Sequence, residues 1–366
     1  MNFDFADILL KVVEHKASDL HITAGAPPTI RVRGSLVPLE GQPNLTPTDT
    51  REIVYAILSS SQRQMLETDW QLDFAYSVPG VGRFRVNTFF QRGTLGAAFR
   101  LIPSETVPID KLGLPPVVRE FAKKPRGIVL VTGPTGSGKS TSLASLINEI
   151  NETRDEHILT IEDPIEFLHR HKRCLVNQRE IGADAPSFAA GLKAALRQDP
   201  DVILVGEMRD QETIGTALTA AETGHLVFAT LHTQDAPQTV DRIIDVFPPA
   251  QQGQIRAQLA IGLQGIVTQT LLPTADGQGR CVAAEVLVPT PGVRNLIREG
   301  KTHQIYSLIQ TGGAEGMQTM DSSLAALVRA GKITMATAES RSSQPVEMRR
   351  LVQGIGSSTP PSPVAV

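Results

Sequence analysis

The sequence predicts an α/β protein with two domains, in which an α+β domain precedes a domain built on a buried parallel sheet. Its 366 residues are about 2.4 times a typical domain of roughly 150 residues, so one small and one larger domain are expected. In the second part of the chain, short aliphatic runs alternate with helical patterns, which is typical of parallel strands covered by helices. The expected boundaries are a domain over 1–102, a linker over 103–126, a domain over 127–353 and a disordered tail over 354–366.

The N-terminal domain shows both helical and strand periodicity. Helical patterns are expected over 3–16 and 48–67. Strands are expected over 19–23, 29–37, 83–90 and 95–101, separated by proline and glycine. Five prolines then crowd residues 103–126, a composition typical of a linker that can pivot.

The second domain carries four short β-rich runs, at 128–132, 158–161, 202–205 and 226–230. A helix is expected over 139–151, and another from Gln211, after the capping candidate Asp210. From about Phe247 onward the pattern is mostly helical. Residues 257–275 are uncharged but contain several glutamines and threonines, so a packed helix is favoured over a membrane span.

Charge and cysteine content narrow the class of protein. The 35 basic and 38 acidic residues give a net charge of −3, so the bulk composition does not indicate a nucleic acid or an acidic membrane surface as partner. Two cysteines are too few for a disulfide framework and lack the spacing of a zinc site. The first residues fail as a secretory signal. We therefore expect a cytoplasmic protein.

A phosphate-binding loop is the strongest motif. Gly133-Pro-Thr-Gly-Ser-Gly-Lys-Ser140 follows an apolar strand and precedes an amphipathic helix. Such a loop turns its backbone N–H groups around phosphates, its lysine neutralises the β and γ oxygens, and its serine hydroxyl binds Mg²⁺. The alternative is a glycine-rich turn without a ligand. The predicted ATP-binding residues are Gly133, Pro134, Thr135, Gly136, Ser137, Gly138, Lys139, Ser140 and Thr141, although Thr141 is better explained as a helix residue than as a ligand.

Polar side chains follow the other predicted strands. Because ligands bind beyond the carboxyl ends of parallel strands, Glu162, Asp163, Glu207 and His232 are expected to converge on the phosphate loop. We assign Glu207 to activating the attacking water, and Glu162 and Asp163 to the region of the metal, so the predicted metal-binding residues are Ser140 and Glu162.

Structural alternatives stay open for each of these residues. A carboxylate can cap a helix or lie on the surface, and Asp163 precedes a proline, which favours a turn. A lone histidine is often structural, which applies to His232 and more strongly to His225, the other catalytic candidate.

Arginines on the first domain are a further candidate. Arg83, Arg85 and Asn87 alternate with apolar positions, so they line one face of a strand, and Arg100 ends the next strand. Such arginines are usually solvated, but NTPases repeatedly use cationic side chains at the γ-phosphate.

Four motifs in order resemble those of the secretion and type IV pilus ATPases. They are the phosphate loop, Thr160-Ile-Glu-Asp-Pro-Ile-Glu166, Asp199-Pro-Asp-Val-Ile-Leu-Val-Gly-Glu-Met-Arg-Asp210 and Gly224-His-Leu-Val-Phe-Ala-Thr-Leu-His-Thr233. The similarity begins further upstream, at Ala17-Ser-Asp-Leu-His-Ile22. The resemblance implies a PAS-like N-terminal domain, a RecA-like ATPase domain with C-terminal helices, and a homohexameric ring on the cytoplasmic face of the inner membrane, under a pilus platform protein. It also implies that Glu207 is the catalytic base and that Arg85 and Arg100 meet ATP.

Within that family, the chain resembles the branch that retracts type IV pili in twitching motility. Gly292-Val-Arg-Asn-Leu-Ile-Arg-Glu299 matches the A-I-R-N-L-I-R-E motif of this branch with two substitutions. Its apolar stripe Val293, Leu296 and Ile297 indicates either core packing or a surface that passes the nucleotide state to the pilus machinery.

Other functions stay open at this point. The runner-up is a pilus assembly or type II secretion motor. Less favoured are a RecA-like nucleic acid motor, against which the net charge argues, and a scaffold with a dead nucleotide site, against which Lys139 and Glu207 argue.

Overall fold

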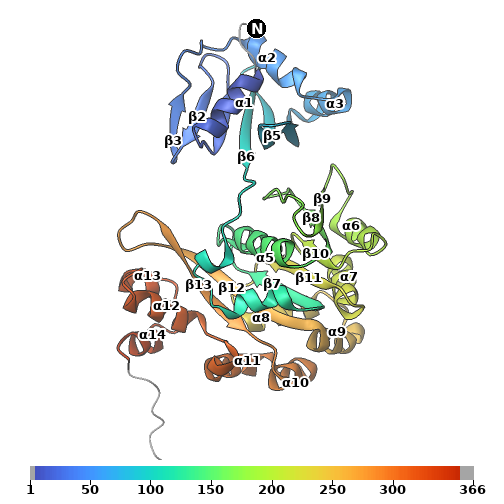
Figure 1. Cartoon of the computed structure of the whole chain (residues 1–366), viewed down its shortest axis with the longest axis vertical. Coiled ribbons are helices and arrows are strands. Elements are labelled where there is room, and N and C mark those ends of the chain that lie inside the picture. Colours follow the sequence, from blue (N-terminus) through green and yellow to red (C-terminus); the bar gives the residue numbers. More distant parts are fainter. Residues whose placement is uncertain (1–4, 355–366) are drawn as a thin grey trace, which may run out of the picture. The chain divides into compact units, whose positions relative to one another are not determined.

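The computed structural model describes residues 5–354, and these form two compact units (Figure 1). The N-terminal unit contains the described residues up to Glu105 together with Glu166–Leu168. The C-terminal unit contains Thr106–Ile165 and the described residues from His169 onward. The expected tail 354–366 lies outside the described residues, apart from Gly354.

The N-terminal unit is an antiparallel sheet with helices on one face. Its strand order is β3-β2-β1-β6-β5-β4. The strands are β1 (Asp19–Ile22), β2 (Thr29–Val32), β3 (Ser35–Pro38), β4 (Gln71–Val78), β5 (Gly82–Gln91) and β6 (Thr94–Ile102), and the helices are α1 (Phe5–Glu14), α2 (Pro47–Ala56) and α3 (Ser60–Asp69). Alternate side chains such as Phe84, Val86 and Phe99 are buried against the helices. The opposite face carries Arg85 and Arg100, which are exposed.

Three elements of this unit differ from the sequence predictions. The helix expected over 48–67 is two helices, because the Ser59 hydroxyl accepts a hydrogen bond from Gln62 N and starts a new helix with a reciprocal capping box. The strand expected over 29–37 is the hairpin β2–β3, which turns at Arg33 and Gly34, where φ is positive. Strand β4 was not predicted, although Leu72, Phe74, Tyr76 and Val78 stand at every second position, as in a half-buried edge strand.

The expected linker 103–126 is mostly wrong, because most of it packs into the C-terminal unit. It holds α4 (Val117–Glu120) and the short 3₁₀ helices η1 (Ile109–Lys111) and η2 (Phe121–Lys123). Phe121 is buried, and a Cβ at Gly265 would lie 2.3 Å from its ring. The prolines start short helical turns in this segment, so their number alone does not indicate a pivot.

The C-terminal unit is built on a seven-stranded sheet in the order β13-β12-β7-β11-β10-β8-β9, parallel except for the β12–β13 pair. The strands are β7 (Gly127–Thr132), β8 (His157–Glu162), β9 (Leu175–Glu180), β10 (Val202–Val205), β11 (Leu226–Leu231), β12 (Leu263–Pro273) and β13 (Arg280–Leu287). The helices are α5 (Lys139–Thr153), α6 (Phe188–Ala195), α7 (Gln211–Glu222), α8 (Ala236–Asp245), α9 (Pro249–Gly262), α10 (Pro291–Glu299), α11 (Ile305–Thr311), α12 (Met320–Arg329), α13 (Met335–Glu339) and α14 (Pro345–Val352).

Both faces of this sheet are buried, as the aliphatic runs predict. On β7, Ile128 and Leu130 belong to a core shared with α6 to α11, whereas Val129 and Val131 belong to a core shared with α5. Because both faces of such a sheet are covered, only the ends of its strands are open to solvent and ligands. We call the row of carboxyl-terminal strand ends the carboxyl edge and the row of amino-terminal strand ends the amino edge.

The helical prediction for 257–275 is half wrong. Helix α9 ends at Gly262 and the chain continues as strand β12. A fully buried strand is as apolar as a buried helix, but Ile266, Val267 and Thr268 form a β-branched run that favours the strand. No helix among the described residues is long and apolar enough to cross a membrane.

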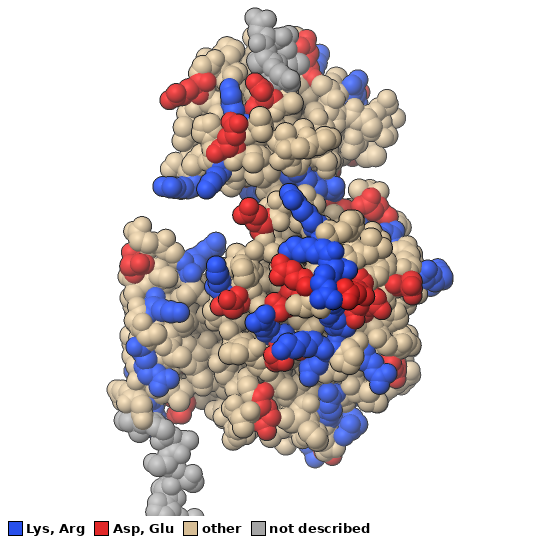
Figure 2. Space-filling view, viewed as in Figure 1, with Lys and Arg blue, Asp and Glu red and all other residues tan. Residues whose placement is uncertain are grey.

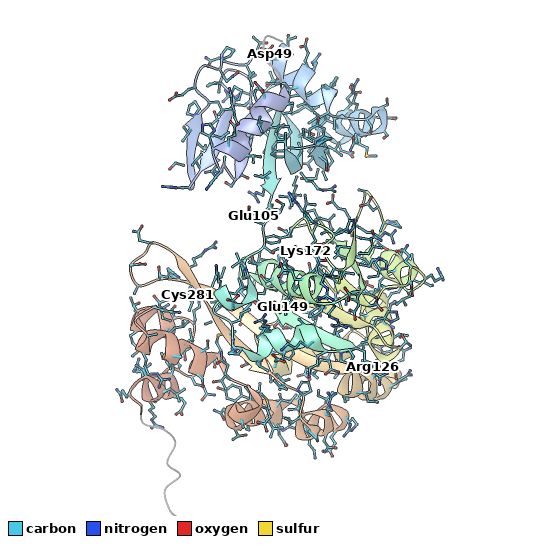
Figure 3. All side chains as sticks on the ribbon, in the orientation of Figure 1. Asp49, Glu105, Arg126, Glu149, Lys172 and Cys281 are labelled. Atoms are coloured by element: carbon cyan, nitrogen blue, oxygen red, sulfur yellow. The ribbon has the colours of Figure 1, made fainter. Side chains whose placement is uncertain are left out.

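The surface charges of the C-terminal unit are mixed in sign. Figure 2 shows Lys and Arg interspersed with Asp and Glu on the face in view. Cys174 is buried and Cys281 is partly exposed on β13 (Figure 3), and both are free thiols. Burial raises the pKa of each, so neither has the low pKa of a reactive thiolate.

Candidate functional site

The phosphate loop joins the carboxyl end of β7 to α5. Gly133 has φ +135°, and a Cβ at this position would lie 2.3 Å from the main-chain oxygen of Gln269. Glycine is therefore required there both for the backbone angle and for the space. Ser140 is exposed in the first turn of α5, where free N–H groups and the helix dipole favour an anion.

Two side chains hold this loop in shape. Lys139 Nζ donates to the main-chain oxygens of Gly133, at 2.8 Å, and Pro134, at 3.1 Å. Burial lowers the pKa of Lys139, and the charge of Glu207 acts against this effect. From β12, Gln269 Nε2 donates to Ser137 O at 2.8 Å, and both residues are 2% exposed. The loop is therefore tied to the neighbouring strand.

Glu207 follows β10 and lies between the side chains of Arg209 and His232. Arg209 donates to both of its oxygens, at 2.6 and 2.7 Å, and His232 Nε2 lies 3.1 Å from Glu207 Oε1. Burial would raise the pKa of Glu207, but the hydrogen bond from Arg209 and the charges of His232, Arg209 and Lys139 outweigh it, so the pKa is lowered. Glu207 is therefore an ionised carboxylate at neutral pH, able to accept a proton.

Glu162 is the last residue of β8, which pairs with β10 on the side opposite β11. It is 8% exposed, and its Oε1 accepts hydrogen bonds from Thr160 Oγ1 at 2.6 Å and Gln178 Nε2 at 3.3 Å. Asp163 is exposed, next to a cis peptide bond with Pro164, and its charge acts on Arg209. The two carboxylates thus lie at the carboxyl edge of the sheet, as predicted, but in different surroundings.

His225 does not lie with the other predicted site residues. It precedes β11, and its main-chain oxygen accepts from Gly127 N, at the start of β7. The phosphate loop begins after the other end of that strand, about 17 Å away at 3.3 Å per residue. His225 Nδ1 instead contacts Ala220 O at 3.0 Å. Within one chain, His225 therefore lies at the end of the sheet opposite the phosphate loop, and its predicted catalytic role stays a prediction.

Arg85 and Arg100 lie in the N-terminal unit, directly opposite each other on β5 and β6. Arg100 Nε donates to Asp19 Oδ1 at 2.8 Å, and Asp19 also contacts Arg31 at 3.9 Å. These side chains form one row across the sheet face. Their predicted role at a phosphate stays a prediction.

The sequence reasoning missed Arg209 and Gln269. Arg209 stands two residues after Glu207 within the quoted motif, so its charge was a local signal. Gln269 lies 132 residues from Ser137, and only the pairing of β12 with β7 brings them together.

The chain belongs to the type II/IV secretion system protein family, whose model matches residues 4–340. This class is the one that the phosphate loop and the carboxyl-edge acidic residues point to.

Among the similar proteins are some whose names refer to pilus retraction or twitching motility. The chain is 50% identical over 345 residues to the type IV pilus retraction ATPase PilT of Pseudomonas aeruginosa, covering 93% of this chain and 99% of that protein. It is 52% identical over 314 residues to a twitching motility protein of Neisseria gonorrhoeae, covering 86% and 84%. A crystal structure of the pilus retraction motor PilT with bound ADP matches with a TM-score of 0.88 and 52% identity, covering 95% of this chain and all of that one. The predicted fold class is thereby confirmed.

Proposed function

We propose that this protein is an ATPase motor that powers type IV pilus retraction. The observation that carries the proposal is the meeting of an intact phosphate loop with the ionised Glu207 and with His232 at one sheet edge. The 50% identity to a pilus retraction ATPase over 93% of this chain supports the biological role.

The residues divide the work as follows. The loop backbone and Lys139 bind the β and γ phosphates, for which Lys139 exchanges its contacts with Gly133 O and Pro134 O. Glu207 accepts the proton of the attacking water, and His232 orients Glu207 through their 3.1 Å contact. Arg209 must release part of its double hydrogen bond first, which costs little because its side chain is 75% exposed.

We propose Mg²⁺ as the companion of ATP, held by Ser140 with Glu162 nearby. Among residues 5–354, no group of three His, Cys, Asp or Glu is arranged around a metal site. Mg²⁺ at a phosphate loop takes most ligands from phosphates and water, so the exposed Ser140 hydroxyl fits this role. The ion would neutralise charge on the transferred phosphoryl group. Glu162 would act through water, since its Oε1 already accepts two hydrogen bonds.

We further propose a homohexamer that acts at the cytoplasmic face of the inner membrane on a pilus platform protein, without nucleic acid. In this ring, Arg85 and Arg100 would meet ATP bound by the C-terminal unit of a neighbouring chain. The support is chemical: both arginines are exposed on one sheet face, and Arg100 is only partly neutralised by Asp19.

Deleting the gene in its host tests the biological role. We expect loss of twitching and accumulation of surface pili, restored by the wild-type gene and not by Glu207→Gln. Loss of pili would instead identify an assembly motor, and loss of protein secretion with normal pili would identify a secretion motor.

Mixing two inactive variants tests the shared site. Arg85→Ala/Arg100→Ala chains and Glu207→Gln chains should each hydrolyse ATP slowly, by a factor on the order of 10³ for lost transition-state charge. Mixed rings should regain part of the activity. No recovery in mixed rings of verified composition would contradict arginine donation between chains.

A further inference from the structure

Glu285 is a buried carboxylate that has no role in the site described above. It lies on β13, opposite Thr268 of β12, and is 3% exposed. Its Oε1 accepts a hydrogen bond of 2.8 Å from the main-chain N–H of Ala236, and the main-chain N–H of Met320 stabilises its negative charge. One carboxylate therefore joins two backbone segments that are far apart in sequence.

Ala236 and Met320 are the first residues of α8 and of α12. Both helices already have their own caps, because Asp235 accepts from Gln238 N in α8 and Thr319 accepts from Ser322 N in α12. Capping of either helix thus does not require Glu285. What Glu285 adds is a direct connection between the two helix N-termini, whose dipoles both favour a negative charge there.

The helix α8 leads back to the nucleotide site within four residues. His232, which contacts Glu207 Oε1 at 3.1 Å, precedes Ala236 in the loop that enters the helix. Thr233 in the same loop contacts Thr239 of α8 at 2.7 Å, so a side-chain hydrogen bond joins the loop to the helix.

The second helix beside Glu285, α12, continues into the C-terminal helices. Asp321, which is 2% exposed, accepts hydrogen bonds from Ser342 at 2.6 Å and Ser343 at 3.0 Å, just before α14. A short chain of contacts therefore runs from Glu207 through His232, α8 and Glu285 to α12 and α14.

The charge of Glu285 is set by its surroundings. Its pKa is raised to about 7, mainly by burial and also by the charges of Asp235 and Asp321, while the N–H groups of Ala236 and Met320 act against this rise. Tyr306 of α11 also interacts with it, and the charge of Glu285 helps raise the pKa of Tyr306. Glu285 is thus negative and a strong acceptor above neutral pH, and neutral below it.

We propose that Glu285 is a positioning residue that connects the His232 loop of the ATPase site to the C-terminal helices, by holding the first N–H groups of α8 and α12. The proposal rests on the proposed ATPase function. Its ionised form keeps His232 beside Glu207, and its neutral form loosens this connection.

Glu285→Gln tests the proposal because it resembles the neutral acid in shape. We expect kcat for ATP to fall roughly tenfold at pH 8, as small displacements of catalytic groups cost rate, with KM little changed. The wild-type kcat should rise as the pH rises through about 7, and the variant should lack this rise.

The stability of the Glu285→Gln variant should change in the direction opposite to its kcat, a result that a simple packing role would not produce. A pKa raised from 4.5 to about 7 means that wild-type stability falls as the pH rises across this interval. Glu285→Gln should therefore melt at a higher temperature than wild type at pH 8 but not at pH 5. Joint loss of stability and activity at pH 8 would overturn the proposal.

Asp321→Asn is the matched control, since it alters a buried acid that binds Ser342 and Ser343 but does not touch α8. It should keep a rise of kcat with pH, displaced to lower pH because the charge of Asp321 raises the pKa of Glu285. If it abolishes that rise as Glu285→Gln does, the effect is not specific to Glu285.

Hydrogen exchange on the wild-type protein gives a test independent of any variant and of hydrolysis. After correction for intrinsic rates, the amides of Ala236 and Met320 should be less protected at pH 6 than at pH 8. Equal protection overturns the role of Glu285, whereas absent ATP hydrolysis with the expected exchange change overturns the proposed function instead.

Discussion

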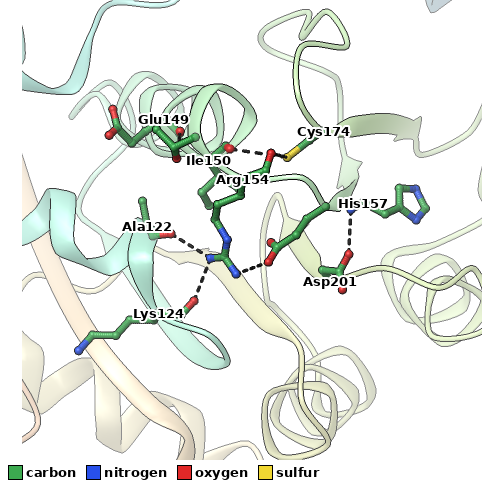
Figure 4. Close-up of polar contacts among 10 residues, drawn as sticks. Ala122, Lys124, Glu149, Ile150, Arg154, His157, Cys174 and Asp201 are labelled. Atoms are coloured by element: carbon green, nitrogen blue, oxygen red, sulfur yellow. Dashed lines mark hydrogen bonds and ion pairs between the residues drawn. The ribbon is translucent and has the colours of Figure 1, made fainter.

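The two edges of the parallel sheet in the C-terminal unit carry similar polar side chains but hold them by different partners. At the carboxyl edge, Glu207 is held by the side chains of Arg209 and His232, which are 75% and 45% exposed. At the amino edge, Arg154 is only 21% exposed and donates to the main-chain oxygens of Ala122 and Lys124, both at 3.0 Å (Figure 4).

This difference in partners indicates that the carboxyl edge serves catalysis and that the amino edge serves stability. Exposed pairs of side chains can be replaced by water or a ligand at small cost. A bond from a side chain to a buried main-chain oxygen breaks only when that segment moves, and it leaves an unpaired polar group. We therefore expect substitutions at the carboxyl edge to change turnover, and substitutions at the amino edge to change stability.

The largest expected effect comes from the two ends of β10. Glu207→Gln removes the group that accepts the proton, so ATP hydrolysis should fall by a factor on the order of 10² to 10⁴, while ATP binding, measured by titration of a fluorescent analogue, is retained.

The matched control is Asp201→Asn, at the other end of the same strand, where Asp201 accepts from His157 N at 2.9 Å (Figure 4). It should leave turnover within a few-fold of wild type. Near-normal hydrolysis by Glu207→Gln would move the base to another residue.

Arg154→Met should cost stability without affecting turnover of the folded protein. It leaves two main-chain oxygens and the partly buried Glu156 without their donor, a loss of about 2–3 kcal/mol. Urea denaturation of the purified protein measures it.

Arg173→Ala provides the comparison, because Arg173 pairs with Asp155 at the surface through two hydrogen bonds. Its removal should change the urea midpoint little. An equal loss in both variants would remove the distinction between buried main-chain contacts and surface pairs.

Arg209→Ala should have the smallest effect, on the pH dependence of turnover. The hydrogen bond from Arg209 lowers the pKa of Glu207. The stability that the ionised carboxylate contributes is therefore present above the ordinary pKa of a glutamate and is lost as the pH falls through the lowered pKa. Without Arg209 the pKa rises, and the acid limb of the kcat profile should move to higher pH. A profile that stays unchanged would show that Arg209 does not set the ionisation of Glu207.

Short-range patterns determined much of the fold. The aliphatic runs gave the strands β7, β8, β10 and β11, because a strand buried on both faces must be apolar throughout. The predictions were wrong where packing against another segment of the chain decides the structure. The residues of β12 were predicted to continue a buried helix, and the prolines of 103–126 were predicted to form a linker.

For the site, sequence alone determined the phosphate loop, Glu162, Glu207 and His232, because each follows an aliphatic run and parallel strands bring such ends together. Only the tertiary structure placed Gln269 on Ser137, whereas His225 already precedes the strand predicted over 226–230 and so belongs to its amino end. The physical reason is that strand order and direction depend on packing between segments more than 100 residues apart, which leaves no trace in the local pattern of either segment.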